Sequence, residues 1–179
     1  MEQTNTVNAA QTQAENAGEL LHSWYSDSVQ SLFTLEHEII QIRDSVMSAN
    51  GAFVSLNPVA AMAAQFLASL DNIRILAGRN LIHAAYIIDG YVDVHPEERA
   101  KRAQELISAY VSLLEHAADM TTAFIGFLED ADTSELSPSE DYSLTLASIQ
   151  ERISCMLDKT YNLATPQYGD CEDSTASNA

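Results

Sequence analysis

The sequence predicts an all-α protein folded as an antiparallel bundle of four long helices. Apolar residues recur at steps of three and four over four long segments, no strand-like alternation of useful length competes, and the connections are short. We expect helices at about 19–49, 58–93, 96–129 and 138–163. The bundle would form a single domain at 18–164, between a flexible polar leader at 1–17 and a flexible acidic tail at 165–179.

The first helix has a coiled-coil-like seam, ended by Asn50 and Gly51. The seam residues are Tyr25, Leu32, Leu35, Ile39, Ile42 and Val46. A second set widens the stripe, as expected of a helix that packs against two neighbours. If exposed instead, this set would mark a homodimer surface or a groove for a client protein. It consists of Val29, Phe33, Ile40 and Met47.

The second helix opens at Asn57 and Pro58, where a capping side chain is followed by proline in the first helical position. The apolar residues keep the same helical spacing on both sides of Gly78, so we expect one continuous helix. Glycine lowers the local helix stability at this position. The long uncharged stretch before Asp71 could indicate a membrane-spanning helix. The continuous apolar part after Pro58 is only about half the roughly 20 residues that a bilayer needs, so a bundle helix is the better interpretation.

The remaining two helices also carry start signals. His95 serves as a turn residue before Pro96, and the acidic residues Glu97 and Glu98 suit the positive end of the helix dipole. A capping box with proline at its first helical position opens the fourth helix at 137–140. A short connection between the second and third helices makes them antiparallel.

The charge balance indicates which partners the protein can have. Eight Lys and Arg face twenty-six Asp and Glu, a formal net charge of −18. Such a field repels phosphate backbones and anionic membranes, so we expect no direct nucleic-acid or membrane binding and favour a basic protein partner. Cys155 and Cys171 form neither a disulfide framework nor a metal spacing, and the N-terminus lacks a signal-peptide pattern, so we expect a cytoplasmic protein.

Acidic residues gather around the connection between the third and fourth helices. Two of them lie at the unfavourable end of a helix dipole, at a cost of about 0.3 to 1 kcal/mol each when exposed. We interpret the cluster as a candidate docking site for a basic protein, with solubility as the competing explanation. Its residues are Glu129, Asp130, Asp132, Glu135, Glu140 and Asp141.

Catalytic and cofactor motifs are absent from the sequence. There is no glycine-rich phosphate loop, no nucleophile elbow and no zinc-type pairing, and Cys155 is expected to be a small buried residue. We therefore expect neither an enzyme nor a cofactor. A single Glu-x-x-His pattern leaves a mononuclear metal or small-ligand site as a weak alternative, with helical histidines more often simply bridging core and solvent. Its candidate ligands are Glu19, His22, His83 and Glu105.

We favour two other functional hypotheses over the metal site. The first is a non-enzymatic acidic module that binds a basic protein, in one form an inhibitor that mimics nucleic acid and occupies a basic groove, of the kind that mobile elements deploy against host defence. The second is a helical adaptor, chaperone or oligomerising scaffold, including a homodimer, that uses apolar helix faces.

Overall fold

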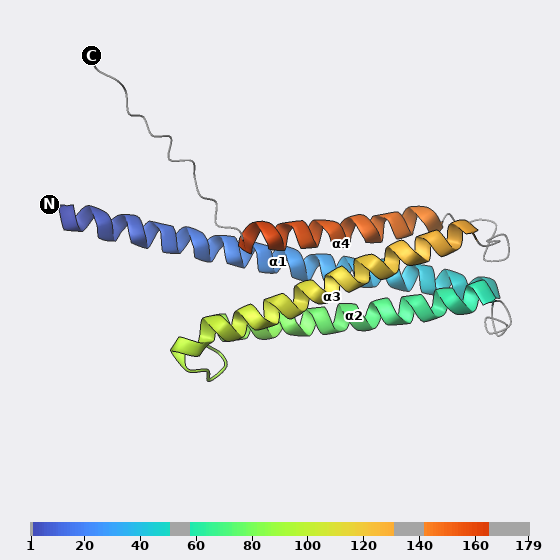
Figure 1. Cartoon of the computed structure of the whole chain (residues 1–179), viewed down its shortest axis with the longest axis horizontal. Helices are drawn as coiled ribbons and strands as arrows, with labels where there is room; N and C mark the ends of the chain where they lie inside the picture. Colours follow the sequence, from blue (N-terminus) through green and yellow to red (C-terminus); the bar gives the residue numbers. More distant parts are fainter. Residues whose placement is uncertain (1, 51–57, 131–141, 165–179) are drawn as a thin grey trace, which may run out of the picture.

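The structure is an all-α bundle of four helices, as the sequence predicts (Figure 1). This computed structural model describes residues 2–50, 58–130 and 142–164, with side chains described at 19–44, 58–129 and 145–163. The helices are α1 (Glu2–Asn50), α2 (Pro58–Ile88), α3 (Pro96–Asp130) and α4 (Tyr142–Ala164). No strand occurs within these ranges.

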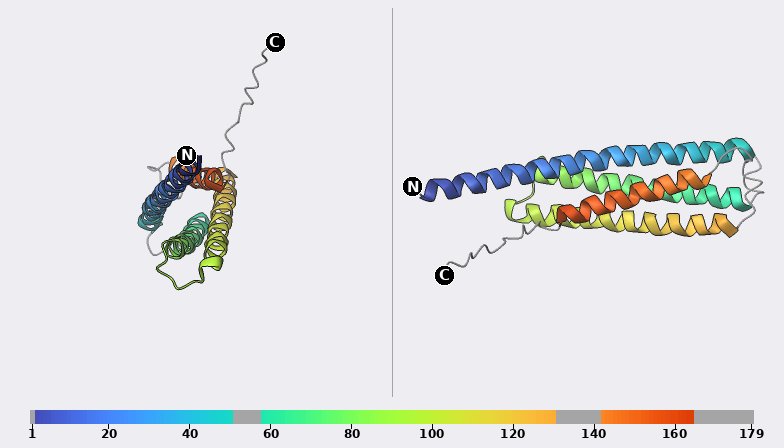
Figure 2. Two further views of the ribbon diagram at one scale, coloured as in Figure 1. Left: turned by 90° about the vertical axis from the view of Figure 1, so that its left-hand side faces the viewer. Right: turned by 90° about the horizontal axis from the view of Figure 1, so that it is seen from above.

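Each helix packs against two neighbours. Helix α2 contacts α1 and α3, and α4 contacts the same pair from the other side, with α2 and α3 sharing the most extensive contact. The end-on view in Figure 2 shows the resulting four-cornered arrangement. The side view shows consecutive helices running in opposite directions, which confirms the antiparallel prediction.

Helix α1 is longer than predicted. It begins at Glu2 and extends over 49 residues, so that its N-terminal part projects beyond the other three helices (Figures 1 and 2). The backbone is thus helical through 2–17, where we expected a leader, while the flexibility of that segment stays a prediction. None of the other described helices lies beside the projecting part, so it lacks the tertiary packing that supplies most helix stability in proteins.

Helix α2 ends at Ile88, five residues before the predicted boundary of 93. Gly90 has a positive φ of 78°, its N–H donates to the Ile87 carbonyl at 3.2 Å, and the Tyr91 N–H donates to the Tyr86 carbonyl at 2.9 Å. These two bonds form a Schellman motif, in which a left-handed glycine ends the helix. The Tyr86 and Tyr91 rings meet edge to face across the motif. Gly78, in contrast, lies inside an uninterrupted helix.

The core combines buried apolar faces of all four helices. Helix α2 contributes both small alanines and large apolar residues to this core. Phe66 of α2 stacks on Phe124 of α3, with ring centroids 4.2 Å apart. The largest fully buried side chains are Leu35, Ile39, Leu67, Leu70, Leu81, Tyr110, Leu114, Leu146, Ile149 and Ile153.

Two expectations for α4 are wrong. Cys155 is exposed, because the buried stripe runs through Ile153, Met156 and Thr160, and Cys155 points about 200° around the helix from Ile153. The apolar period of the fourth helix in the sequence, through Ile149, Ile153, Met156 and Tyr161, also predicts a buried Tyr161, which is 46% exposed for the same reason. The capping box at 137–140 lies outside the described residues.

Candidate protein-binding surfaces

A charge network joins α1 to α4. Glu38 of α1 retains only 12% of its side-chain exposure and accepts two hydrogen bonds from Arg152, from Nη2 at 2.7 Å and from Nε at 3.0 Å. The Ser148 hydroxyl adds a third bond at 2.9 Å. The pKa of Arg152 is raised above its usual value, mainly because its guanidinium donates hydrogen bonds to Glu38. A bidentate pair of this kind fixes geometry as well as charge, so it sets the register of α1 on α4.

Two further ion pairs hold α1 to its neighbours. Arg74 of α2 bonds to Glu36 of α1 at 3.0 Å and to Asp71 of its own helix at 2.8 Å. Lys159 of α4 bonds to Asp27 of α1 at 2.9 Å. Because these pairs cross both α1 interfaces, the described part of the bundle is a support of defined geometry rather than a loosely packed set of helices.

Polar side chains also lie inside the bundle, where α1, α3 and α4 meet. Trp24 Nε1 donates to the Thr160 hydroxyl at 3.1 Å, and the Trp24 ring meets Tyr110 edge to face. Ser28 is buried beside them. The Tyr110 hydroxyl has no hydrogen-bond partner of acceptable geometry within the described residues. Burial raises the pKa of Tyr110 to about 12, and the nearby Ser28 and Thr160 hydroxyls oppose that shift.

The structure does not assemble the candidate metal ligands. Glu19, His22, His83 and Glu105 are all exposed. No group of three or more His, Cys, Asp or Glu that could hold a metal ion occurs among the described residues, which include all four. His22 instead lines a groove between α1 and α2, level with Ala85 as the fold predicts.

Only a small part of the predicted acidic cluster can be placed. Glu129 is exposed near the end of α3, the Asp130 backbone closes that helix, and Asp132, Glu135, Glu140 and Asp141 lie outside the described residues. A further acidic group follows the outer side of α3, where no Lys or Arg occurs after Arg102. Its exposed members are Glu105, Glu115, Asp119 and Glu129.

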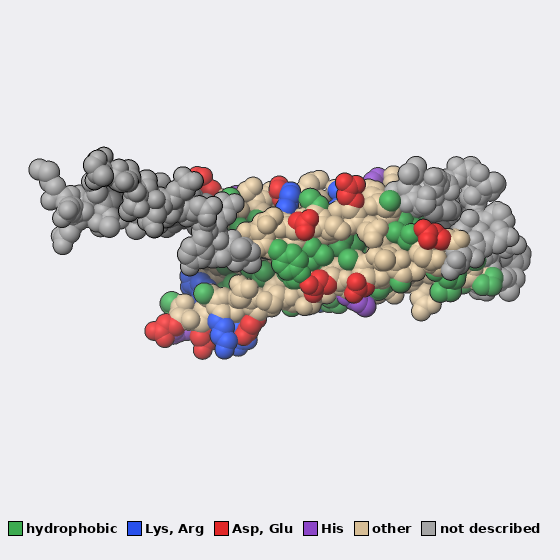
Figure 3. Space-filling model, turned by 45° about the horizontal axis from the view of Figure 1, so that its top comes forward, with side chains coloured by type: hydrophobic (Ala, Val, Ile, Leu, Met, Phe, Trp, Pro, Cys, Tyr) green, Lys and Arg blue, Asp and Glu red, His purple; other side chains and the backbone are tan. Residues whose placement is uncertain are grey.

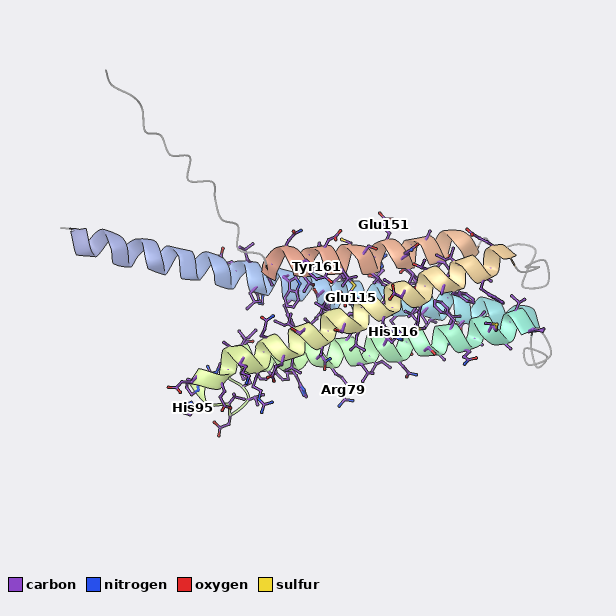
Figure 4. All side chains as sticks on the ribbon, in the orientation of Figure 1. Arg79, His95, Glu115, His116, Glu151 and Tyr161 are labelled. Atoms are coloured by element: carbon purple, nitrogen blue, oxygen red, sulfur yellow. The ribbon has the colours of Figure 1, made fainter. Side chains whose placement is uncertain are left out.

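On the face shown in Figure 3, the described acidic side chains are separated by hydrophobic and uncharged polar surface. Glu115 accepts a hydrogen bond from the Tyr161 hydroxyl of α4, which raises the pKa of Tyr161. Figure 4 shows these two side chains lying toward each other, while Glu151 points outward from α4. Lys and Arg gather where α2 turns into α3, the part of the chain that contains Arg99, Lys101 and Arg102.

An apolar stripe runs along the solvent-facing side of α2, opposite the buried stripe of the same helix. Ile75 is 44% exposed, Ile82 39% and Tyr86 48%. Arg79 lies among them, points away from the bundle and forms no ion pair with any described residue (Figure 4). We call this stripe the outer α2 face. Its residues, all exposed and alternating at steps of four and three, are the apolar Ala68, Ile75, Ile82 and Tyr86 and the polar Asn72 and Arg79.

Two grooves border the outer α2 face on the α1 side. One, of about 220 Å³, is lined by Phe33, Ile75, Gly78 and Ile82 among others. The second, of about 340 Å³, continues along the same seam past Tyr25 and Tyr86. Phe33 is 60% exposed, so this member of the widening set on α1 is not used to pack a neighbour. Val29 and Ile40 are half-buried, and the Met47 side chain lies outside the described part of α1.

The apolar character of α2 on both sides explains why it resembles a membrane span. By length and composition it is the one helix in the described ranges that could cross a bilayer, and 33% of its most apolar window is buried. One such helix is weak evidence for a membrane span, because a mostly buried core helix or a signal sequence passes the same test. The Arg74–Glu36 ion pair attaches α2 to α1, and the Phe66–Phe124 stack attaches it to α3.

The fold and its surfaces define an antiparallel four-helix bundle with an exposed apolar face on one helix and an acidic side on another. Comparison with models of protein families, with curated proteins and with solved structures finds no match to this chain. The surfaces themselves are therefore the basis for a functional proposal.

Proposed function

We propose that this protein is a non-enzymatic, cytoplasmic binding module that recognises another polypeptide through the outer α2 face and the grooves beside it. The observation that carries the proposal is the exposure of Ile75, Ile82 and Tyr86 on one side of a helix whose other side is fully packed. An exposed apolar stripe at coiled-coil spacing suits a helix of a partner, with i, i+3 and i+7 anchors.

The packing of the bundle supports this interpretation. Contiguous apolar surface is unfavourable on a soluble monomer and commonly marks an interaction site. Gly78 lies in the floor of the first groove, and a Cβ there would meet only Leu32, at 3.7 Å. The backbone of α2 is therefore accessible to close approach. Phe33 and Ile82 lie on the two helices that line this groove and so offer anchors from both sides.

A second candidate function rests on the acidic side of α3. Its exposed carboxylates, with no base after Arg102, are compatible with a basic protein partner, including an inhibitor that mimics nucleic acid in a basic groove. The apolar proposal takes precedence because Ile75, Ile82 and Tyr86 leave apolar area in solvent, whereas exposed carboxylates are normal on a protein surface.

Site-specific photo-crosslinking in the native cell tests the proposal. A photoreactive amino acid at Ile82 should give covalent adducts with another polypeptide or a second copy, and the same group at Glu151, on the outside of α4, should not. Adducts from Glu151 alone, or from neither position, would contradict binding through α2. Adducts from Asp119 that form in a cell lysate at low salt, but do not form when the lysate is irradiated at about 0.5 M salt, would support the acidic alternative instead.

A further inference from the structure

We propose that the occupant of the outer α2 face is a second copy of this chain, with the two α2 helices packed antiparallel about a two-fold axis near Ala77. This inference rests on the proposed function, because it names the partner of the same surface. A two-fold interface is isologous, so each residue of the face must find a suitable counterpart on an identical face running in the opposite direction.

The sizes of the side chains on the face satisfy that requirement. In an antiparallel arrangement centred on Ala77, Tyr86 lies opposite Ala68 of the second copy, and Ala68 lies opposite its Tyr86. The largest residue of the face is thus matched with the smallest at both ends. Ile82 lies opposite Asn72, and Ile75 packs on the aliphatic stem of Arg79, a use of the arginine side chain that leaves its charge in solvent. The alternating spacing gives the a–d′ layers of an antiparallel coiled coil.

The distribution of charge favours the same face for self-association. Helix α2 contains Asp71, Arg74 and Arg79, which makes it the one helix within its described bounds where bases outnumber acids. Asp71 and Arg74 are also paired with each other. Helices α1 and α3, in contrast, both carry excess acid. Two copies of a chain with net charge −18 can therefore approach most easily with α2 facing α2.

The face is of modest size. From Ala68 to Tyr86 it extends about 27 Å at 1.5 Å per residue. With the diameter of one helix, about 10 to 12 Å, it covers roughly 300 Å² on each copy, below the roughly 800 Å² of a standard interface. We therefore expect a dimer that dissociates in the micromolar range and that exchanges with monomer.

Net charge gives this dimer a distinctive response to salt. Two copies of charge −18 repel each other through solvent, and salt screens that repulsion while leaving apolar contact intact. Raising the NaCl concentration from about 0.05 M to about 0.5 M should tighten the dimer, by about tenfold or more. Association with a basic protein through the acidic side of α3 should weaken under the same change.

Sedimentation equilibrium of the full chain, at both salt concentrations, is the first test. The intact protein should dimerise more tightly at high salt, and Ile82→Glu should be monomeric at every concentration. The matched control is Ala147→Glu, which places the same charge on an exposed position of α4 and should dimerise like the unaltered chain. Far-UV circular dichroism establishes that both variants are folded. A monomer at high salt, or equal dimerisation of the two variants, would overturn the proposal.

A disulfide test addresses the register. In a chain with Cys155→Ser and Cys171→Ser, the pair Ala68→Cys and Tyr86→Cys should form crosslinks between position 68 of one copy and 86 of the other. The two positions are about 27 Å apart on one helix, so no bond can form within a chain. Crosslinks joining 68 to 68 would contradict the antiparallel arrangement. If the chain is monomeric but Ile82 still captures a different polypeptide in the cell, self-association fails while the proposed function stands.

Discussion

Removal of the Arg152 guanidinium is a strong test of the structure's internal organisation. In Arg152→Met, Glu38 loses two of its three hydrogen bonds and keeps only the Ser148 hydroxyl, at 2.9 Å. The Glu38 side chain is 12% exposed, so solvent cannot fully replace the lost partner. Breaking a fully buried pair costs about 3 to 5 kcal/mol. Because Arg152 is 28% exposed, we reduce this to about 2 to 3 kcal/mol.

Chemical and thermal unfolding measure that loss. For a bundle of this size, 1 kcal/mol corresponds to about 2 to 4 °C in Tm, so Arg152→Met should lower Tm by about 5 to 10 °C. Replacing both partners, in Glu38→Leu with Arg152→Met, should recover at least half of the loss, because no uncompensated charge then remains. The reasoning is refuted if Arg152→Met costs less than about 0.5 kcal/mol, the level of an exposed pair, or if the double variant is less stable than the single one.

Three further outcomes follow from individual residues. Stability should fall by about 2 to 3 kcal/mol between pH 10 and pH 12, because burial raises the pKa of Tyr110 from 10.0 to about 12 and the unfolded chain loses that proton first. Tyr110→Phe should abolish that contribution. Gly78→Ala should stabilise by about 0.5 to 1 kcal/mol and Gly90→Ala should destabilise by at least about 1 kcal/mol, as equilibrium unfolding will report. Cys155 should react with a thiol reagent in the folded protein nearly as fast as after unfolding.

Each of these predictions has a contradicting result. A flat stability profile above pH 10, or one unchanged in Tyr110→Phe, would show that Tyr110 titrates normally. A loss of stability in Gly78→Ala would indicate a tighter contact with Leu32 than 3.7 Å allows. Protection of Cys155 by more than about tenfold would mean that the outer side of α4 is covered.

The helices were predictable because their signals are local. Pro96 and the apolar period fix α3 within one residue of its observed end. The end of α2 was misjudged because the apolar period continues to Tyr91, whereas the left-handed Gly90 and its two backbone bonds stop the helix earlier. A glycine followed by an aromatic residue was the available signal for this motif.

Polar residues inside the bundle were not predictable from a pattern of apolar residues. The first seam was assigned to Tyr25, but the buried residue is Trp24, whose stripe includes the polar Ser28 and Glu38. Thr160, the partner of Trp24, and Arg152, the partner of Glu38, each lie more than a hundred positions away in sequence. Only the fold brings these groups together, so residues that look unsuitable for a core become part of it.

The candidate surface was partly predictable. The excess of apolar residues on α1 was visible in the sequence, but it predicted packing against a second neighbour, and Phe33 is instead 60% exposed. The outer α2 face could not be predicted from the sequence. A helix that is apolar on two opposite sides has the same apolar composition as a helix that is buried all round. The core direction, set by the packing of Leu70, Ala77 and Leu81, separates the two stripes.

The most direct test of the central claim is whether the outer α2 face is covered in the cell. Single cysteines at Ile82 and at Ala147, each in a chain with Cys155→Ser and Cys171→Ser, should react equally fast with a thiol reagent in dilute purified protein. In the native cell, we expect labelling at 82 to be slower by about tenfold or more, with labelling at 147 unchanged. Equal labelling at both positions in the cell would contradict the claim that α2 is a binding surface.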